Sequence, residues 1–259
     1  MRARIILTLA LLTSAACAPL TSYRTDYGLC VSSNPDLQCP THALQQYNET
    51  DGSGYLLGFI ELDDQGQLFD RAQMQAVLGA ISTEVAPDSQ DFLMVVFVHG
   101  WKHNAAPGDD NIATFRRVLV GLSKTEQAVS VATGARPRKV IGVYIGWRGA
   151  SITAWGLKEA TFWDRKNTAH KVGHGDVTEV LNRLDLIRQT KDSMDGGQSE
   201  SRLVIVGHSF GGAVVFAAVS QILEERFVRT VGPSGVTSDA GGFGNLVVLI
   251  NPAFELIII

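Results

Sequence analysis

The sequence predicts an α/β fold, a three-layer sandwich in which a mostly parallel sheet carries helices on both faces. Strand-length apolar runs alternate with stretches whose apolar residues recur at helical spacing. The runs at 54–62, 92–98, 139–147 and 202–206 are apolar almost throughout, which is typical of strands buried on both faces. Because strands and helices alternate, we expect parallel strands joined by right-handed crossovers. The 259 residues are enough for one domain with a substantial core.

Four helices are expected, each from a capping residue before an apolar stripe or from an apolar run after a turn. They are a helix capped by Asp70 and ended by Pro87, a helix over 111–129 capped by Asp110, a helix from Asp176 to about Lys191, and a helix over 213–219. A Gly/Ser/Asp loop over 232–244 then leads into a further strand at 245–252, which is also expected to be buried.

The most informative stretch is 202–212, where an apolar run ends in a serine enclosed by glycines. It predicts a strand, a sharp turn and a helix, with Ser209 on the turn itself. Strained backbone at such a turn requires very small residues two positions before and after the serine, and Gly207 and Gly211 meet that demand. Ser209 would also lie at a helix N-terminus, where backbone amides favour developing negative charge.

The segment from Gly207 through His208 and Ser209 to Gly211, continued by Gly212, resembles the nucleophile elbow of the α/β-hydrolases, a family of lipases, esterases and related acyl hydrolases. The resemblance covers about residues 55–255 and implies the α/β-hydrolase type of sandwich. It implies a serine hydrolase of carboxylic esters, with acyl lipids as the favoured substrates and no cofactor. The alternative is an envelope-anchored binding or scaffolding protein that keeps the fold without catalysis.

A second resemblance to this family lies at 92–101, a strand that runs into His99, Gly100 and Trp101. In the α/β-hydrolases, the amide after the His-Gly pair and the amide after the nucleophile form the oxyanion hole. The resemblance therefore implies that the backbone amides of Trp101 and Phe210 hold the oxyanion. His99 is expected to shape this loop rather than to act as a base.

The triad of the α/β-hydrolases runs along the chain from serine to an acid and then to a histidine. All six histidines here precede Ser209: His42, His99, His103, His170, His174 and His208. Glu255 has a plausible position for the acid, and a surface or pocket role is its alternative. We therefore expect a truncated or frameshifted product that lacks the triad histidine and has no esterase activity as it stands.

Residues 1–18 have the pattern of a secretory signal peptide, with Arg2 and Arg4 before a short apolar core. That core is too short to cross a bilayer. The residues up to Cys17 resemble the lipobox of bacterial lipoproteins, which implies a lipid anchor on Cys17; ordinary cleavage without lipidation is the alternative. Either outcome predicts the bacterial cell envelope, membrane-anchored, periplasmic or secreted.

Residues 19–53 are expected to form a tether before a domain that starts at 54. With Cys17 lipidated, Cys30 and Cys39 remain as an even pair, which favours a disulfide in an oxidising compartment. Two unpaired thiols are the alternative. The residues from 151 to 175 exceed what one crossover needs, and Trp155, Phe162 and Trp163 make this insertion either a lid over an acyl pocket or a packed surface elaboration.

The charge and histidine patterns favour no other class of function. A net charge of -4 without a basic cluster gives no footprint for nucleic acid. The pairs His99/His103 and His170/His174 have i, i+4 spacing but lack the H-E-x-x-H pattern and a placed third ligand, so no metal is expected.

Overall fold

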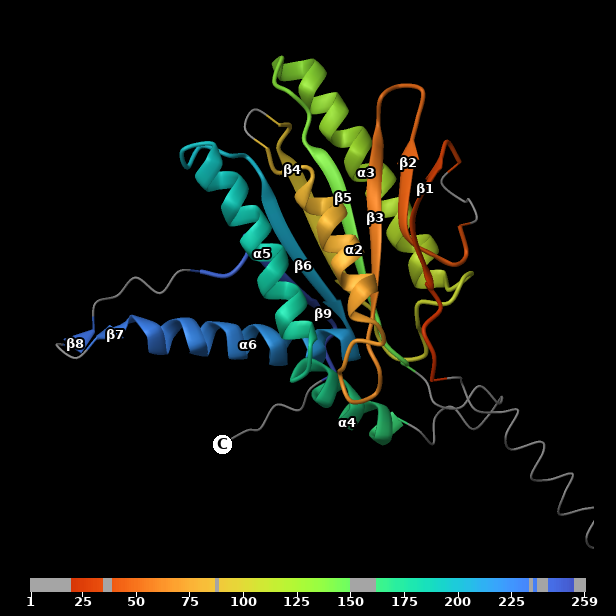
Figure 1. The fold of residues 1–259 in the computed structure, drawn as a ribbon, viewed down its shortest axis with the longest axis vertical. Coiled ribbons are helices and arrows are strands. Elements are labelled where there is room, and N and C mark those ends of the chain that lie inside the picture. The colour runs from red at the N-terminus through yellow and green to blue at the C-terminus, as the bar shows by residue number, and fades with distance from the viewer. Residues whose placement is uncertain are drawn as a thin grey trace, which may run out of the picture.

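The computed structural model describes residues 20–34, 39–86, 89–149, 162–232, 235–236 and 242–253. Its centre is a seven-stranded sheet whose strands follow the order β1-β2-β3-β5-β4-β6-β9 (Figure 1). These strands are β1 (Asp26–Ser32), β2 (His42–Asn48), β3 (Gly54–Glu61), β4 (Phe92–Val98), β5 (Lys139–Gly146), β6 (Arg202–His208) and β9 (Leu246–Ile250). Neighbours in this order are parallel except β2 and β3, so the expectation of a mostly parallel α/β sheet is confirmed.

In the described ranges, five helices cover the two faces of the sheet: α2 (Arg71–Ser82), α3 (Asp110–Thr133), α4 (Phe162–Gly173), α5 (Val177–Met194) and α6 (Phe210–Thr230). On one face, α3 packs Ile112, Phe115 and Leu119 into a core with Phe59 and Tyr144. On the other face, α2, α4, α5 and α6 share a second and larger core. A small hairpin of β7 (Val231–Gly232) and β8 (Gly235–Val236) follows α6.

The strand order places a change of direction between β4 and β6 (Figure 1). From β4 the chain passes through α3 to β5, whereas from β6 it passes through α6 on the opposite face to β9. β4 and β6 are neighbours, but the chain leaves them in opposite directions along the sheet, from β4 to β5 on one side and from β6 to β9 on the other. In open α/β sheets such a point leaves a crevice outside the carboxyl ends of the strands, where ligands bind. Any site of this fold is therefore expected where β4 and β6 end.

The tether expected over 19–53 is wrong for two segments, because Asp26–Ser32 forms β1 and His42–Asn48 forms β2 of the main sheet. β2 pairs with β3 from Leu44 opposite Gly58 to Asn48 opposite Gly54. Ala43, Leu44 and Tyr47 are buried, so this segment has a core face after all. Its two glutamines, of which Gln45 is also buried, hid the apolar pattern from sequence analysis.

Two of the expected helix caps need correction. Asp109, not Asp110, caps α3, because its carboxylate accepts a hydrogen bond of 2.9 Å from the Asn111 amide. Asp176 does precede α5, but it makes no cap hydrogen bond and accepts one from the Leu68 amide instead.

Three element boundaries and two burial patterns also differ from expectation. α2 ends at Ser82 instead of continuing to Pro87, and α6 begins at Phe210, three residues before the apolar run that predicted it. The expected loop over 232–244 includes the short strand β8. β6 is half-exposed at alternate residues, and β9 is an edge strand rather than a buried one, with Leu246 and Ile250 exposed.

The insertion over 151–175 is described from residue 162 onward, and there it forms α4. Ala169 and Val172 of α4 are fully buried, and Gly173 lies against α6 at Val214 and Ala217. This part of the insertion therefore belongs to the packed core. Trp155 lies outside the described residues, as do the signal peptide with Cys17 and the position of Glu255, and the side chains of Phe162 and Trp163 are not described. Within the described ranges, no helix has the length and apolarity that a membrane span requires.

Candidate active site

Ser209 is the single residue between the end of β6 at His208 and the start of α6 at Phe210. Its φ is 54°, in the left-handed region that non-glycine residues rarely adopt. Among the described residues, only Lys102 and Asn251 share this property without being glycine. Such backbone strain persists only where the surroundings enforce it, and it concentrates at functional sites. The sharp turn that the sequence indicates around Ser209 is thus present.

The glycines around Ser209 are required by close approaches of backbone to backbone. A Cβ on Gly207 would lie 2.6 Å from the Gly211 carbonyl oxygen. A Cβ on Gly211 would lie 2.1 Å from the carbonyl oxygen of Val98 and 2.5 Å from that of His99. Atoms of the main chain cannot give way as a flexible side chain can, so no larger residue fits at either position.

The loop after β4 lies directly against the serine. A Cβ on Gly100 would be 2.9 Å from the Ser209 Cβ and 2.8 Å from the His208 carbonyl oxygen. The residues that follow, Trp101 and Phe210, have ring centroids 6.4 Å apart. The structure therefore brings together the two segments that the sequence singled out, although 108 residues separate Trp101 from Ser209 along the chain.

The loop after β9 also supports the turn, and sequence analysis did not identify this contribution. The Ser209 amide donates to the Ile250 carbonyl oxygen at 2.9 Å, and the Ser209 carbonyl oxygen accepts from the Ala253 amide at 3.1 Å. A Cβ on Gly212 would lie 2.9 Å from the Pro252 Cβ. Asn251, with a φ of 48°, turns the chain so that these contacts are made. Nothing local in residues 250–253 reveals this contact, because it depends on the β6–β9 register.

His99 is fully buried at the start of the loop after β4 and is locked by three hydrogen bonds. Its Nδ1 lies 2.9 Å from the Gly100 carbonyl oxygen, and its Nε2 lies 3.0 Å from the amide nitrogen of Trp147. A carbonyl only accepts and an amide only donates, so Nδ1 carries the proton and the ring is neutral. The Trp147 indole in turn donates to the His99 carbonyl oxygen at 3.0 Å, and the two rings stack with centroids 5.6 Å apart.

Burial lowers the pKa of His99 to about 4, because a charged imidazolium would lose its solvation there. With both ring nitrogens engaged and the ring neutral, His99 has no means of taking a proton from Ser209. It shapes the loop, in agreement with the role that the sequence indicated.

His103 and Asp109 form a pair within the loop that joins β4 to α3. The His103 Nδ1 lies 3.1 Å from Asp109 Oδ1. Burial by itself would raise the pKa of Asp109, but hydrogen bonds from His103 and from the amides of Asn111 and Asn104 outweigh it and lower the pKa. Asp109 thus fixes the loop, the start of α3 and the ring of His103 at once. Sequence analysis missed this pair, although the sequence shows a His and an Asp six residues apart in a predicted loop before a helix, which could have indicated it.

Glu255, the acid that the sequence suggests, lies outside the described residues. His170 and His174 lie in and just after α4, and His42 lies in β2. In the part of the chain that the structure describes, no hydrogen bond joins the Ser209 hydroxyl to a histidine or a carboxylate. A cavity of about 210 Å³ lies at the opposite end of the sheet, between Asn48, Gln90 and Lys139, and is not part of this site.

Comparison of the chain with protein-family models, curated proteins and solved structures finds no match. The candidate site therefore rests on its own geometry.

Proposed function

We propose that this protein is a serine hydrolase of carboxylic esters, with Ser209 as the nucleophile. One observation carries the proposal: Ser209 has a φ of 54° on a one-residue strand-to-helix turn, at the carboxyl end of a strand beside the change of direction in the sheet. A packed scaffold that holds a serine in such a conformation, with glycines on every side, favours an exposed nucleophile over a structural residue.

The reaction that this arrangement supports is acyl transfer in two steps. The Ser209 Oγ attacks the acyl carbon, its proton passes to a base, and the carbonyl oxygen becomes an oxyanion beside the amides of Trp101 and Phe210. Collapse of the intermediate releases the alcohol, and water then cleaves the acyl-enzyme to the carboxylic acid. The start of α6 adds the positive end of its dipole at the same place. A histidine base oriented by an acid, for which Glu255 is the proposed residue, would complete the reaction.

Acyl lipids are the favoured substrates within this proposal. Trp101, which is half-buried and lies in the loop packed against Ser209, offers an aromatic side chain that suits an apolar acyl chain, whereas the ring of Phe210 is fully buried in the core. A lipid anchor on Cys17 would hold the protein at the cell envelope, where such esters occur. Replacing Cys17 by Ser is expected to move the protein from the membrane fraction to the soluble fraction of a bacterial host. Retention of the variant in the membrane fraction would contradict the anchor.

A non-catalytic binding protein is the second candidate, and it has an observation of its own. Among the described residues the Ser209 hydroxyl has no hydrogen-bond partner, and the buried His99 below it is neutral and locked. A turn of this geometry without a base would bind a ligand through its amides and leave it unchanged.

Covalent labelling by a fluorophosphonate distinguishes the two candidates, because only an activated serine reacts rapidly. A form of the protein that carries the histidine base is expected to be labelled at Ser209, as located by peptide mass spectrometry. Ser209→Ala should remove the label, whereas Ser220→Ala, which changes an exposed serine further along α6, should leave it. Hydrolysis of p-nitrophenyl esters should follow the same pattern. A folded protein that carries the histidine base and is still not labelled at Ser209 would exclude the hydrolase and support the binding protein.

A further inference from the structure

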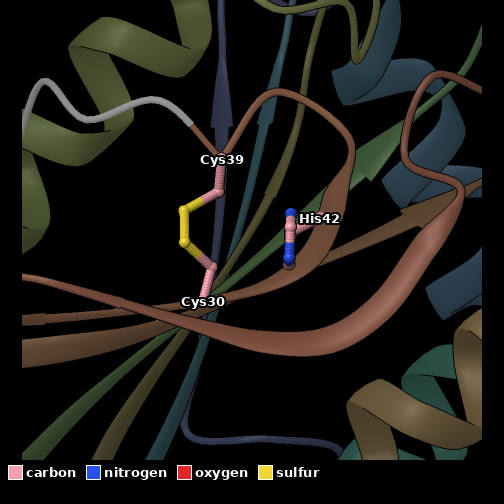
Figure 2. Close-up of side chains that lie close together, drawn as sticks. All are labelled: Cys30, Cys39 and His42. Carbon is pink, nitrogen blue, oxygen red and sulfur yellow. A yellow bond between two sulfur atoms is a disulfide. The ribbon is translucent and has the colours of Figure 1, made fainter.

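A second cluster of reactive side chains lies away from Ser209, where β1 approaches the start of β2 (Figure 2). Cys30 and Cys39 are joined by a disulfide, with their Cα atoms 6.2 Å apart, which is the pairing that the sequence suggested. The imidazole of His42 lies beside this disulfide (Figure 2). One ligand atom from each residue, two sulfurs and a ring nitrogen, lies within 4.8 Å of the other two.

The two nitrogens of His42 have different surroundings. Nε2 lies 3.2 Å from the Asp26 Oδ2. Nδ1 is buried and has no hydrogen-bond partner in the structure. A buried polar atom without a partner is costly, so its presence needs a reason. Imidazoles that bind metals have this arrangement, in which a carboxylate holds one ring nitrogen and leaves the other for the ion.

We propose that Cys30, Cys39 and His42 form a binding site for a thiophilic cation such as Zn²⁺ when the disulfide is reduced. Two thiolates and one imidazole are a ligand set that Zn²⁺ accepts. In tetrahedral geometry, with Zn–S of about 2.3 Å and Zn–N of about 2.0 Å, ligand atoms are about 3.5 to 3.8 Å apart. The three side chains each place one ligand atom within 4.8 Å of the other two, and after reduction the two bonded sulfurs must move apart to about 3.8 Å, which rotation of the cysteine side chains can supply. Because Cys30 and His42 are partly exposed, water can fill the fourth position.

The disulfide and the metal site are alternative states of the same residues. A dithiol reductant transfers two electrons and two protons to the disulfide, which gives two cysteine thiols and leaves the reductant as its own disulfide. Binding of Zn²⁺ then displaces the two thiol protons to solvent, and the two thiolates and the neutral imidazole hold the ion. Reoxidation of the thiols would release the ion.

The backbone around the cluster is held by contacts that do not involve sulfur. The carbonyl oxygen of Cys39 accepts hydrogen bonds from the buried Arg24 at 3.3 Å and from Gln45 at 3.0 Å, and the His42 amide donates to it at 3.1 Å. Strand pairing places Cys30 opposite Gln45. Reduction therefore breaks the covalent bond but leaves these contacts to keep the residues close together.

The test is metal binding by the full chain in its oxidised and reduced forms. A Cys17→Ser background leaves Cys30 and Cys39 as the only cysteines, and a phosphine reductant reduces them. After removal of free metal, we expect one Zn²⁺ per reduced chain and none per oxidised chain, by elemental analysis. Co²⁺ in place of Zn²⁺ should show a thiolate-to-cobalt charge-transfer band.

The variants assign the ligands. His42→Ala should weaken Zn²⁺ binding at least tenfold, and Asp26→Asn, which changes the carboxylate that holds His42, by a smaller factor. His174→Ala removes an exposed histidine elsewhere and should leave binding unchanged. Far-ultraviolet circular dichroism of each reduced variant checks that it is folded. Binding no tighter than that of a Cys30→Ser/Cys39→Ser double variant, or equal binding by His42→Ala and the parent, would overturn the proposal.

Discussion

The two edge strands of the sheet, β1 and β9, are held in different ways (Figure 1). Both expose apolar side chains, Leu29 and Val31 on β1 and Leu246 and Ile250 on β9, so exposure does not separate them. β1 is tied covalently to the segment just before β2 by the Cys30–Cys39 disulfide. In the described residues, β9 is held by its pairing with β6, its packing on α6 and the loop that follows it.

Buried polar groups also reinforce the β1 side and connect it to the site. Glu61, at the end of β3, accepts hydrogen bonds from the amides of Tyr23 and Arg24 and from the side chains of Ser22 and Gln73. The fully buried Arg24 donates to the carbonyl oxygens of Cys39, Pro40 and Ala105. Ala105 lies in the loop after β4, so the network anchors the loop that carries Trp101.

The two halves of the candidate site therefore depend on different edges. The loop after β4 is fixed by buried hydrogen bonds of His99 and Arg24, whereas the backbone of Ser209 is fixed by Ile250 and Ala253 at the β9 edge. Loss of order at β9 would release the serine and leave the loop after β4 in place. The predictions that follow test this division, from the largest expected effect to the smallest.

Gly211 is where the two halves touch, so its replacement should have the largest effect. In Gly211→Ala the new Cβ would meet the Val98 carbonyl oxygen at 2.1 Å, and two main chains would have to separate. We expect a loss of more than about 3 kcal/mol of unfolding free energy, measured by urea denaturation, because overpacking against backbone has no cheap relaxation. Gly79→Ala is the matched control. Its Cβ would meet nothing within 4 Å in α2, and it should stabilise the protein by about 0.5 to 1 kcal/mol. A mild effect of Gly211→Ala would contradict the close contact between the halves.

Arg24→Met should be nearly as costly, with a loss of about 3 kcal/mol. The variant keeps an apolar stem of similar length but leaves three buried carbonyl oxygens with fewer donors. Arg71→Met removes an exposed arginine that pairs with Glu179 and should change stability by less than about 0.5 kcal/mol. Equal effects of the two variants in urea denaturation would show that the Arg24 network does not anchor the β1 side.

The strands and the serine turn could be predicted from the sequence because their signals are local. The runs around 92–98 and 139–147 are apolar at every position that the sheet buries, and the glycines around Ser209 are spaced as the turn demands. β1 and β2 could not be predicted, because Gln45 is buried only through a partner on α3, Arg116, and through the Cys39 carbonyl oxygen. The support of Ser209 by Ile250 and Ala253 depends on register between strands about forty residues apart. Local patterns carry no information on such contacts.

His99 should make the stability of the fold sensitive to pH. Its pKa is about 4 in the folded state and about 6.5 in the unfolded state, so the unfolded chain binds the proton more readily. The contribution of neutral His99 to the unfolding free energy is complete above pH 6.5 and decreases as the pH falls from 6.5 to 4. Below pH 4 it no longer changes with pH. Between pH 7.5 and pH 5 this contribution should fall by about 2 kcal/mol. The measurement is the difference in unfolding free energy between the parent and His99→Gln at both pH values, which cancels the other titrating groups. A difference that does not change with pH would show that His99 is not held neutral.

The smallest expected change in stability concerns the apolar side chains of the two edges, and it sharpens the comparison most directly. Leu246→Lys on β9 and Leu29→Lys on β1 each place a charge on an exposed edge position, so each should alter the unfolding free energy by less than about 0.5 kcal/mol.

The effects of these two substitutions on self-association should differ. An edge strand offers unpaired backbone groups to another chain, and a lysine on it hinders that pairing. β9 lacks the covalent restraint that holds β1, and α6 beside it exposes Leu223. We therefore expect Leu246→Lys to reduce concentration-dependent self-association in sedimentation velocity, while Leu29→Lys leaves it unchanged. Equal effects of the two substitutions would mean that the restraint at β1 does not protect its edge, and that the two edges differ only in how they hold the site.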